Sequence, residues 1–250
     1  MTTQSSNCAE PAALVVGAGG GIGSAIVAEL VRDGAYPQIH AVSRAPDPPA
    51  SIAQEHVVWH QCDHGDEDIA AIVDDIRERG AQLQRVVICI GMLHRGELQP
   101  EKALEQVRRE TLQEVLETNT VLPTLWLSAL TPLWRESRQA AVAVLSARIG
   151  SITDNRLGGW YSYRASKAAL NMVLKTAAIE LARRNPQVKL LAFHPGTTDT
   201  ALSAPFQSRV PPEKLFSPAF VARRLLAIMD AAEPDGELSF LDWAGEPVPW

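Results

Sequence analysis

The stretch ALVVGAGGGIG, residues 13–23, decides the fold. Residues 13–16 form an apolar run of strand length, residues 17–23 hold five glycines, and residues 22–32 carry apolar side chains at helical spacing. Glycines between a strand and a helix allow a tight turn, let the backbone approach a pyrophosphate and let the helix pack against the strand. The amino end of the helix also favours negative charge. A flexible turn without a ligand is the alternative, but the strand–loop–helix context favours a dinucleotide-binding loop.

Short apolar runs alternate with helical segments through most of the chain. Strands are predicted at residues 13–16, 38–42, 56–60, 85–90, 140–146 and 189–194, and helices at residues 22–32, 66–79, 101–130 (with a bend near Pro123) and 161–184. Strands that are apolar throughout are typical of a parallel sheet covered on both faces. Right-handed crossovers then favour an α/β fold of the Rossmann type, a doubly wound parallel sheet with helices on both faces. No linker is found, so residues 1–250 are predicted to form a single domain.

The composition is that of an ordinary globular protein, with 46% hydrophobic and 21% charged residues among 250. The net charge is -6 and no Lys/Arg cluster is longer than a pair, so a nucleic-acid partner is not expected. The first ten residues lack the basic and apolar parts of a secretory signal, and no apolar run is long enough to span a bilayer. We therefore expect a cytoplasmic protein without a membrane partner.

Cysteine and histidine residues follow no pattern of a metal centre, so no metal is expected. The cysteines have no metal-ligand spacing, and their odd count favours reduced thiols; they are Cys8, Cys62 and Cys89. The histidines are scattered through predicted strands and loops, at His40, His56, His60, His64, His94 and His194. We interpret His64, with Asp63 and Asp66 nearby, as part of a solvated loop rather than a metal site.

The end of the second predicted strand discriminates between the two nicotinamide cofactors. A carboxylate at this place would bind the ribose 2'-hydroxyl of NAD. The sequence instead has Ser43 followed by Arg44, and a guanidinium can hold a 2'-phosphate through charged hydrogen bonds. The pair therefore predicts NADP(H) in preference to NAD(H). The alternative is that Arg44 is a solvated loop charge.

Tyr163 and Lys167 are four residues apart in a predicted helix and therefore lie on one face of it. Hydride transfer to a carbonyl needs an acid that protonates the forming alkoxide. A tyrosine with an ordinary pKa near ~10 needs a neighbouring ammonium to lower that pKa. We predict that Tyr163 is the acid/base and Lys167 its electrostatic partner. A packed tyrosine beside a solvated lysine is the alternative.

With these features the chain resembles the short-chain dehydrogenases/reductases of the single-domain type over nearly its whole length. Positions that match the family's motifs are Gly17, Gly21 and Gly23 of the glycine loop, Asp63 for the adenine, Asn119 for a water of the proton relay, and Pro195, Gly196 and Thr200 for the nicotinamide amide. The segments 146–152 and 158–164 and the ending 241–250 are more narrowly similar to C-factor proteins and sniffer-like carbonyl reductases.

The resemblance implies reversible hydride transfer between NADP(H) and a small-molecule carbonyl or alcohol. It assigns catalytic roles to Tyr163, Lys167, Ser146 and Asn119, with Lys167 also binding the ribose. The expected cofactor-binding residues are Gly17, Gly19, Gly20, Gly21, Ile22, Gly23, Ser43, Arg44, Asp63, Gly91, Tyr163, Lys167, Pro195, Gly196, Thr198 and Thr200. Residues 197–218 are predicted to be a short substrate lid. A homodimer or homotetramer is expected, with a monomer as the alternative for the C-factor-like branch.

One position departs from the family pattern. The serine that polarises the substrate carbonyl normally stands three residues before a glycine, and counting back from Gly150 gives Ala147. Neighbouring residues of a strand point to opposite faces, so Ser146 takes this role only if the strand has already ended. Ser146 is the predicted polariser; Ser151, or Tyr163 acting alone, are the alternatives.

Two other functions fit parts of the sequence. A cofactor-binding signalling or sensor protein with vestigial turnover is compatible with the resemblance to C-factor proteins and with Ala147. A nucleotide-sugar epimerase is compatible with the spacing of Gly17, Gly20 and Gly23, but only 54 residues follow Gly196, too few for the usual substrate domain of that class.

Overall fold

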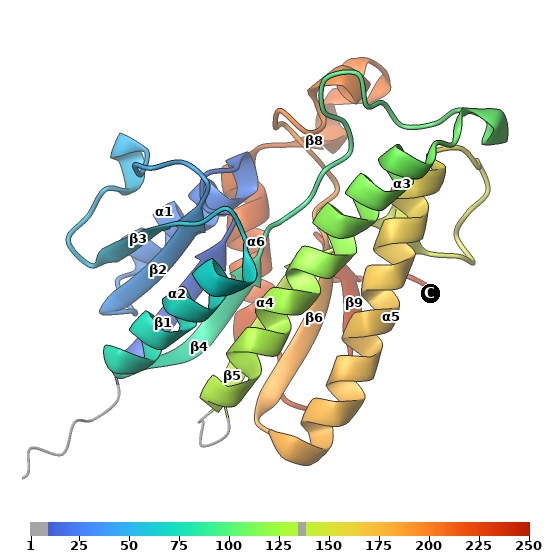
Figure 1. Cartoon of the computed structure of the whole chain (residues 1–250). Helices are drawn as coiled ribbons and strands as arrows, with labels where there is room; N and C mark the ends of the chain where they lie inside the picture. Colours follow the sequence, from blue (N-terminus) through green and yellow to red (C-terminus); the bar gives the residue numbers. More distant parts are fainter. Residues whose placement is uncertain (1–9, 135–138) are drawn as a thin grey trace, which may run out of the picture.

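The computed structural model describes residues 10–134 and 139–250. Seven parallel strands form one sheet in the order β3-β2-β1-β4-β5-β6-β9 (Figure 1). They are β1 (Glu10–Val16), β2 (Gln38–Ser43), β3 (Val57–Gln61), β4 (Ala81–Ile88), β5 (Ala140–Leu145), β6 (Val188–His194) and β9 (Ser239–Asp242). The strand order reverses between β1 and β4, which is where doubly wound sheets bind their ligands. The predicted Rossmann-type α/β fold is confirmed.

Helices cover both faces of the sheet (Figure 1). They are α1 (Gly21–Asp33), α2 (Asp66–Glu78), α3 (Arg109–Leu116), α4 (Leu122–Leu130), α5 (Tyr161–Arg184) and α6 (Pro218–Asp230). On one face, α2, α4 and α5 bury side chains such as Trp126 and Leu170. On the other face, α1 and α6 bury side chains such as Ile26 and Leu225. These two apolar layers hold the ends of the strands, and the loops beyond them, in fixed positions.

The segment predicted as a lid carries little regular structure. A two-stranded sheet pairs β7 (Thr197–Thr198) with β8 (Leu215–Phe216), and a short helix at Ala204–Arg209 lies between them. Further single turns lie at Ala50–Ile52, Leu104–Gln106, Thr131–Trp134, Arg148–Gly150 and Pro212–Lys214.

The prediction of one long helix over residues 101–130, with a bend near Pro123, is correct only from Arg109 onward. The helix starts only at Arg109, and a π-helical turn, Glu117–Val121, separates α3 from α4. Pro123 has no N–H to donate to the carbonyl four residues earlier, that of Asn119, so the regular hydrogen-bond ladder cannot continue there. The opened turn places Asn119 at the site described below. The predicted helix at residues 161–184 is confirmed, whereas α6 and β9 were not predicted.

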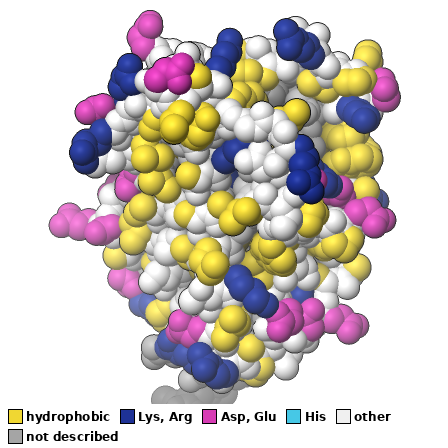
Figure 2. All heavy atoms as spheres, turned by 90° about the vertical axis from the view of Figure 1, so that its right-hand side faces the viewer, with side chains coloured by type: hydrophobic (Ala, Val, Ile, Leu, Met, Phe, Trp, Pro, Cys, Tyr) yellow, Lys and Arg dark blue, Asp and Glu magenta, His cyan; other side chains and the backbone are white. Residues whose placement is uncertain are grey.

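The apolar residues of α5 fall on two sides of the helix. Leu170 and Leu174 are buried in the core, but Met172 is 67% exposed and Ile179 is 47% exposed. Figure 2, which looks onto the α5 side of the molecule, shows hydrophobic side chains scattered among polar ones on this face. The predicted homodimer or homotetramer stays a prediction.

Two further findings concern membrane-spanning helices and the cysteine thiols. No helix within residues 10–134 and 139–250 is long and apolar enough to cross a membrane. Cys62 and Cys89 are free, and burial raises the pKa of both thiols, that of Cys89 to about 12. Cys8 and the segment tested for a secretory signal, up to residue 9, lie outside the described residues.

Candidate active site

The glycine loop needs glycine at two places for clear steric reasons. Gly17 has φ +89°, a left-handed backbone that only glycine adopts without strain. A Cβ at Gly23 would lie 2.2 Å from the carbonyl oxygen of Gly17. The turn is fixed to the sheet because the Gly17 and Ala18 amides both donate to the Val42 carbonyl, at 2.9 and 2.8 Å. The loop is therefore a tight, ordered cradle rather than a flexible turn.

Two other glycines bring distant parts of the chain against this loop. A Cβ at Gly19 would lie 2.4 Å from the Oγ of Ser43, and a Cβ at Gly21 would lie 2.7 Å from the Cγ2 of Thr200. The end of β2 and the start of the lid thus touch the loop directly. Arg44, which follows Ser43, is exposed and lines the cavity described next.

A cavity of about 580 Å³ opens at the carboxyl ends of the central strands. Among the residues predicted from sequence, its lining includes Gly17, Gly20, Gly21, Ile22, Gly23, Arg44, Gly91, Ser146, Tyr163, Lys167, Pro195, Gly196, Thr198 and Thr200. Gly19, Ser43, Asp63 and Asn119 do not line it. Gly19 is part of the loop and lies against the buried Ser43, and Asp63 is exposed after β3. The structure therefore joins the glycine loop and the Tyr163–Lys167 pair in one space.

Lys167 is buried, with 2% of its surface exposed, and its Nζ donates to the Leu145 carbonyl at 2.8 Å. Burial lowers the pKa of Lys167 to about 8 and raises the pKa of Tyr163 to about 12. Burial outweighs any lowering of the Tyr163 pKa by the ammonium. The phenol is therefore protonated at neutral pH and suited to donate a proton.

The Asn119 side chain connects two segments of the site by hydrogen bonds. Its Oδ1 accepts from the Met92 amide at 2.7 Å, and its Nδ2 donates to the Met92 carbonyl at 2.8 Å and to the Ser166 Oγ at 3.0 Å. These bonds join the loop after β4 to α5 and hold Gly91 near Lys167, so that a Cβ at Gly91 would lie 3.7 Å from the lysine Nζ. The amide of Asn119 is fully engaged in this bracing, and its predicted role in a proton relay stays a prediction.

Ser146 lies at the end of β5 and lines the cavity, but its hydroxyl is already in use. The Oγ donates to the Oδ1 of Asn171 on α5 at 2.6 Å. To polarise a substrate carbonyl, Ser146 would have to give up this bond. Ser151, the alternative, is buried outside the cavity lining and accepts from the Asp154 amide at 3.0 Å. Ala147, at the position of the family's serine, lines the cavity without a polar side chain.

Aromatic side chains form one wall of the cavity. The Trp160 ring is 5.0 Å from the Phe206 ring and 6.3 Å from the Tyr163 ring, measured between centroids. Leu93 and Ile149 also line the space. Trp160 lies three residues before Tyr163 in the sequence, whereas Phe206 comes from the lid, whose path the sequence does not indicate.

Trp160 is held in an unusual backbone conformation. Its φ is +54°, in the left-handed region that tryptophan rarely adopts, and it follows two glycines that are also left-handed. The Trp160 amide donates to the Glu101 carbonyl at 2.5 Å, and the buried Glu101 carboxylate accepts from the Ser162 amide at 3.1 Å. Glu101 therefore fixes the start of α5 through its carboxylate and the backbone of Trp160 through its carbonyl.

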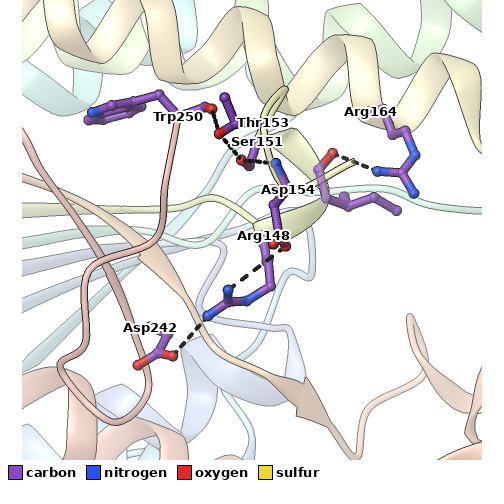
Figure 3. Close-up of polar contacts among 8 residues, drawn as sticks. Arg148, Ser151, Thr153, Asp154, Arg164, Asp242 and Trp250 are labelled. Carbon is purple, nitrogen blue, oxygen red and sulfur yellow. Dashed lines mark hydrogen bonds and ion pairs between the residues drawn. The ribbon is translucent and has the colours of Figure 1, made fainter. Parts of the chain in front are cut away.

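The loop after β5 is anchored to the end of the chain (Figure 3). Arg148 contacts Asp242 at 3.1 Å and Asp154 at 3.8 Å. The Thr153 amide donates to the Trp250 carbonyl at 2.9 Å. Through these contacts β9 and the carboxyl-terminal residues hold one edge of the cavity in place.

His40, His60 and Asp75 are the one group of metal-binding side chains that comes together among the described residues. The Nδ1 of His40 and the Nε2 of His60 are 3.0 Å apart, the ring planes differ by 14° and the centroids are 5.3 Å apart. That centroid distance requires both nitrogens to lie on the line that joins the rings. The geometry is therefore that of one N–H···N hydrogen bond, with the nitrogens aimed at each other and not at a shared ion. The register of β2 and β3 brings the histidines together, which sequence spacing does not reveal.

Comparison with known proteins places this geometry in context. The sequence profile of the family described as short chain dehydrogenase matches residues 11–210. The C-signal of Myxococcus xanthus is 31% identical over 59% of this chain and 84% of its own. A 1-hydroxy-2-glutathionyl-2-methyl-3-butene dehydrogenase of a Rhodococcus strain is 30% identical over 74% of this chain and 76% of its own. The fold matches an NADPH-bound carbonyl reductase from chicken fatty liver, with a TM-score of 0.80 and 23% identity over 96% and 98% of the two chains.

Proposed function

Because the chain belongs to the short-chain dehydrogenase family, an oxidoreductase family, we propose that it reduces an apolar carbonyl compound with NADPH and that Tyr163 supplies the proton. One observation carries the proposal. Tyr163 and Lys167 line the same cavity as the glycine loop and Arg44, so a dinucleotide held by the loop reaches the predicted acid.

The shape of the loop fits a dinucleotide. Gly17 and Gly23 leave no room for side chains at the start of α1, where backbone N–H groups and the helix dipole favour phosphate. Arg44, exposed and facing the same cavity, would bind the 2'-phosphate of NADP(H). The carbonyl reductase of the same fold from chicken fatty liver binds NADPH. Together these observations favour NADP(H) over NAD(H).

In the proposed reaction the bound cofactor supplies the hydride. The phenol of Tyr163 donates its proton to the substrate oxygen, and the raised pKa of the phenol keeps that proton in place at neutral pH. Lys167 holds a positive charge one helical turn away and is fixed by its bond to the Leu145 carbonyl. Trp160 and Phe206 exclude water on the substrate side. This wall favours an aromatic or otherwise apolar carbonyl substrate.

The proposed cofactor is tested by titrating the protein separately with NADPH and NADH and following the nicotinamide fluorescence. NADPH is expected to bind at least ~10-fold more tightly than NADH. Failure of both cofactors to bind at concentrations of about 1 mM would remove the basis of the proposed function.

Arg44→Ala is expected to raise the Kd of NADPH by about 10- to 100-fold and to change the Kd of NADH by less than about twofold, because the charged hydrogen bonds to the 2'-phosphate are lost. Arg32→Ala is the matched control, since Arg32 is on α1 outside the cavity and pairs with Glu29. Equal losses for both cofactors would show that Arg44 does not read the 2'-phosphate.

The rate of carbonyl reduction is expected to fall as the pH rises through about 8. The pKa of Lys167 is lowered to about 8, so its ammonium form is present below that pH and is lost above it, whereas Tyr163 stays protonated because its pKa is raised to about 12. The profile of kcat/KM against pH measures this loss. Lys167→Arg, which keeps its charge, is expected to remove the break even if the overall rate is lower. A flat wild-type profile up to about pH 10 would contradict this role of the lysine.

A signalling role is the second candidate, favoured by the 31% identity with the C-signal of Myxococcus xanthus and by Ala147 in place of the family's serine. Tyr163→Phe separates the two candidates. A biological effect that survives the loss of turnover, with NADPH still bound, would favour signalling, and joint loss of both would favour the enzyme.

A further inference from the structure

In the proposed reduction only Tyr163 is assigned as a hydrogen-bond donor to the carbonyl oxygen of the substrate, and a second donor is not yet assigned. Enzymes that reduce carbonyls gain rate from preorganised donors around the oxygen on which charge develops. Tyr163 is one such donor in the cavity. Ala147 offers none, and the proton of Ser146 is directed to Asn171 at 2.6 Å. In this arrangement a second donor is a group other than Ala147 and Ser146.

His194 lies at the carboxyl end of the sheet, where the cavity opens, and could donate this second hydrogen bond. It is the last residue of β6 and directly precedes Pro195 and Gly196. The Ser146 amide donates to the Phe193 carbonyl at 2.8 Å, which makes His194 the cross-strand neighbour of Ser146. His194 lines the same cavity as Tyr163. His194 therefore belongs to the part of the cavity wall next to the missing serine.

The hydrogen-bonding state of the ring follows from its surroundings. The Nδ1 of His194 and the Nδ2 of Asn171 are both buried and have no partner among the described residues. A buried imidazole nitrogen without a hydrogen-bond partner destabilises the protein less when it is unprotonated than when it carries a hydrogen. Buried N–H groups without a partner are rarer in proteins than buried acceptors without one. The hydrogen of a neutral His194 is then on Nε2, which is not among the buried atoms that lack a partner.

The charges around His194 keep the ring neutral. Burial is the main cause that lowers the pKa of His194 to about 4, and Arg148 lowers it further, while Asp242 and Asp154 act in the opposite direction. Arg148 itself is paired with Asp242 at 3.1 Å (Figure 3). At neutral pH the imidazole therefore has one N–H, which it can share in a hydrogen bond without giving it up.

From these observations we propose that His194 is a catalytic residue, whose neutral imidazole donates an Nε2–H hydrogen bond to the substrate carbonyl oxygen in place of the serine absent at position 147. The proposal rests on the proposed carbonyl reduction. The Nε2 proton stays on His194 throughout, Tyr163 gives up its own proton to the oxygen, and the hydride comes from the bound NADPH.

The test compares His194→Phe, a flat ring without a donor, with His194→Gln, which keeps an N–H, using benzil as the probe substrate. The Phe variant is expected to lose about 100-fold in kcat, as when one donor to a developing oxyanion is removed. The Gln variant is expected to retain within about tenfold of the wild-type kcat. The Kd of NADPH, measured by fluorescence, should be unchanged in both. If His194→Phe does not fold, His194→Leu replaces it.

A second experiment introduces a serine at position 147 of the His194→Phe variant. Ala147→Ser in the His194→Phe background is expected to recover at least about tenfold of the lost kcat, because it restores a donor to the same oxygen. A kcat of His194→Phe within about threefold of the wild type, or a loss that Ala147→Ser leaves untouched, would overturn the proposal. Failure of the proposed function is distinguishable, since the wild-type protein would then not reduce benzil or any other carbonyl.

Discussion

Replacing Tyr163 by phenylalanine is expected to lower kcat for carbonyl reduction by about 10³-fold or more, within the range of general acid catalysis, while the Kd of NADPH changes by less than about threefold. The substitution removes a single hydroxyl and keeps the ring against Trp160, whose centroid is 6.3 Å away. Because Tyr163 is the acid of the proposed reaction, its hydroxyl acts in the transition state and adds little to cofactor binding. Steady-state kinetics and fluorescence titration measure the two effects separately.

Tyr161→Phe is the matched control. Tyr161 is on the same helix, is 37% exposed and does not line the cavity, so its hydroxyl should not affect kcat. A Tyr163→Phe variant that keeps more than about one tenth of the wild-type kcat would show that another group protonates the substrate.

Gly23→Ala is expected to raise the Kd of NADPH by at least about 100-fold and to lower the melting temperature, because the added Cβ would lie 2.2 Å from the Gly17 carbonyl oxygen and the loop must move. A displaced loop no longer presents its backbone N–H groups to the pyrophosphate. Fluorescence titration measures the loss of binding, and circular dichroism during heating measures the loss of stability.

Gly65→Ala is the control for this substitution. Gly65 precedes α2 with φ -67°, and the nearest atom to its added Cβ would be 3.8 Å away. It should bind NADPH as the wild type does. Normal binding by Gly23→Ala would contradict the placement of the cofactor on the glycine loop.

The sequence predicts those parts of the site that depend on local geometry. The glycine loop follows from a strand, a turn and a helix that are contiguous in the chain. Tyr163 and Lys167 follow from a four-residue helical spacing, and the helix at residues 161–184 is confirmed. Arg44 could be placed in the cavity because the end of a strand next to the glycine loop faces the bound nucleotide in this fold.

Features that depend on contacts between distant segments could not be predicted in this way. Pro123 predicts an interruption of the helix, but the sequence does not show that the interruption is a π turn that places Asn119 at the site. To predict the hydrogen bond from Ser146 to Asn171, one has to know which face of β5 packs against α5. The place of His194 beside Ser146 depends on the register between β5 and β6. The last two contacts leave no pattern in the sequence.

The central claim is that this protein couples oxidation of NADPH to reduction of an apolar carbonyl. The most direct measurement mixes the wild-type protein with NADPH and benzil, follows the loss of nicotinamide absorbance, and quantifies the reduced product by chromatography. We predict one alcohol formed for each NADPH consumed, and no product with Tyr163→Phe beyond about one thousandth of the wild-type rate. NADPH that binds but is not consumed with benzil or with any of a panel of aromatic and aliphatic ketones and aldehydes would contradict the claim.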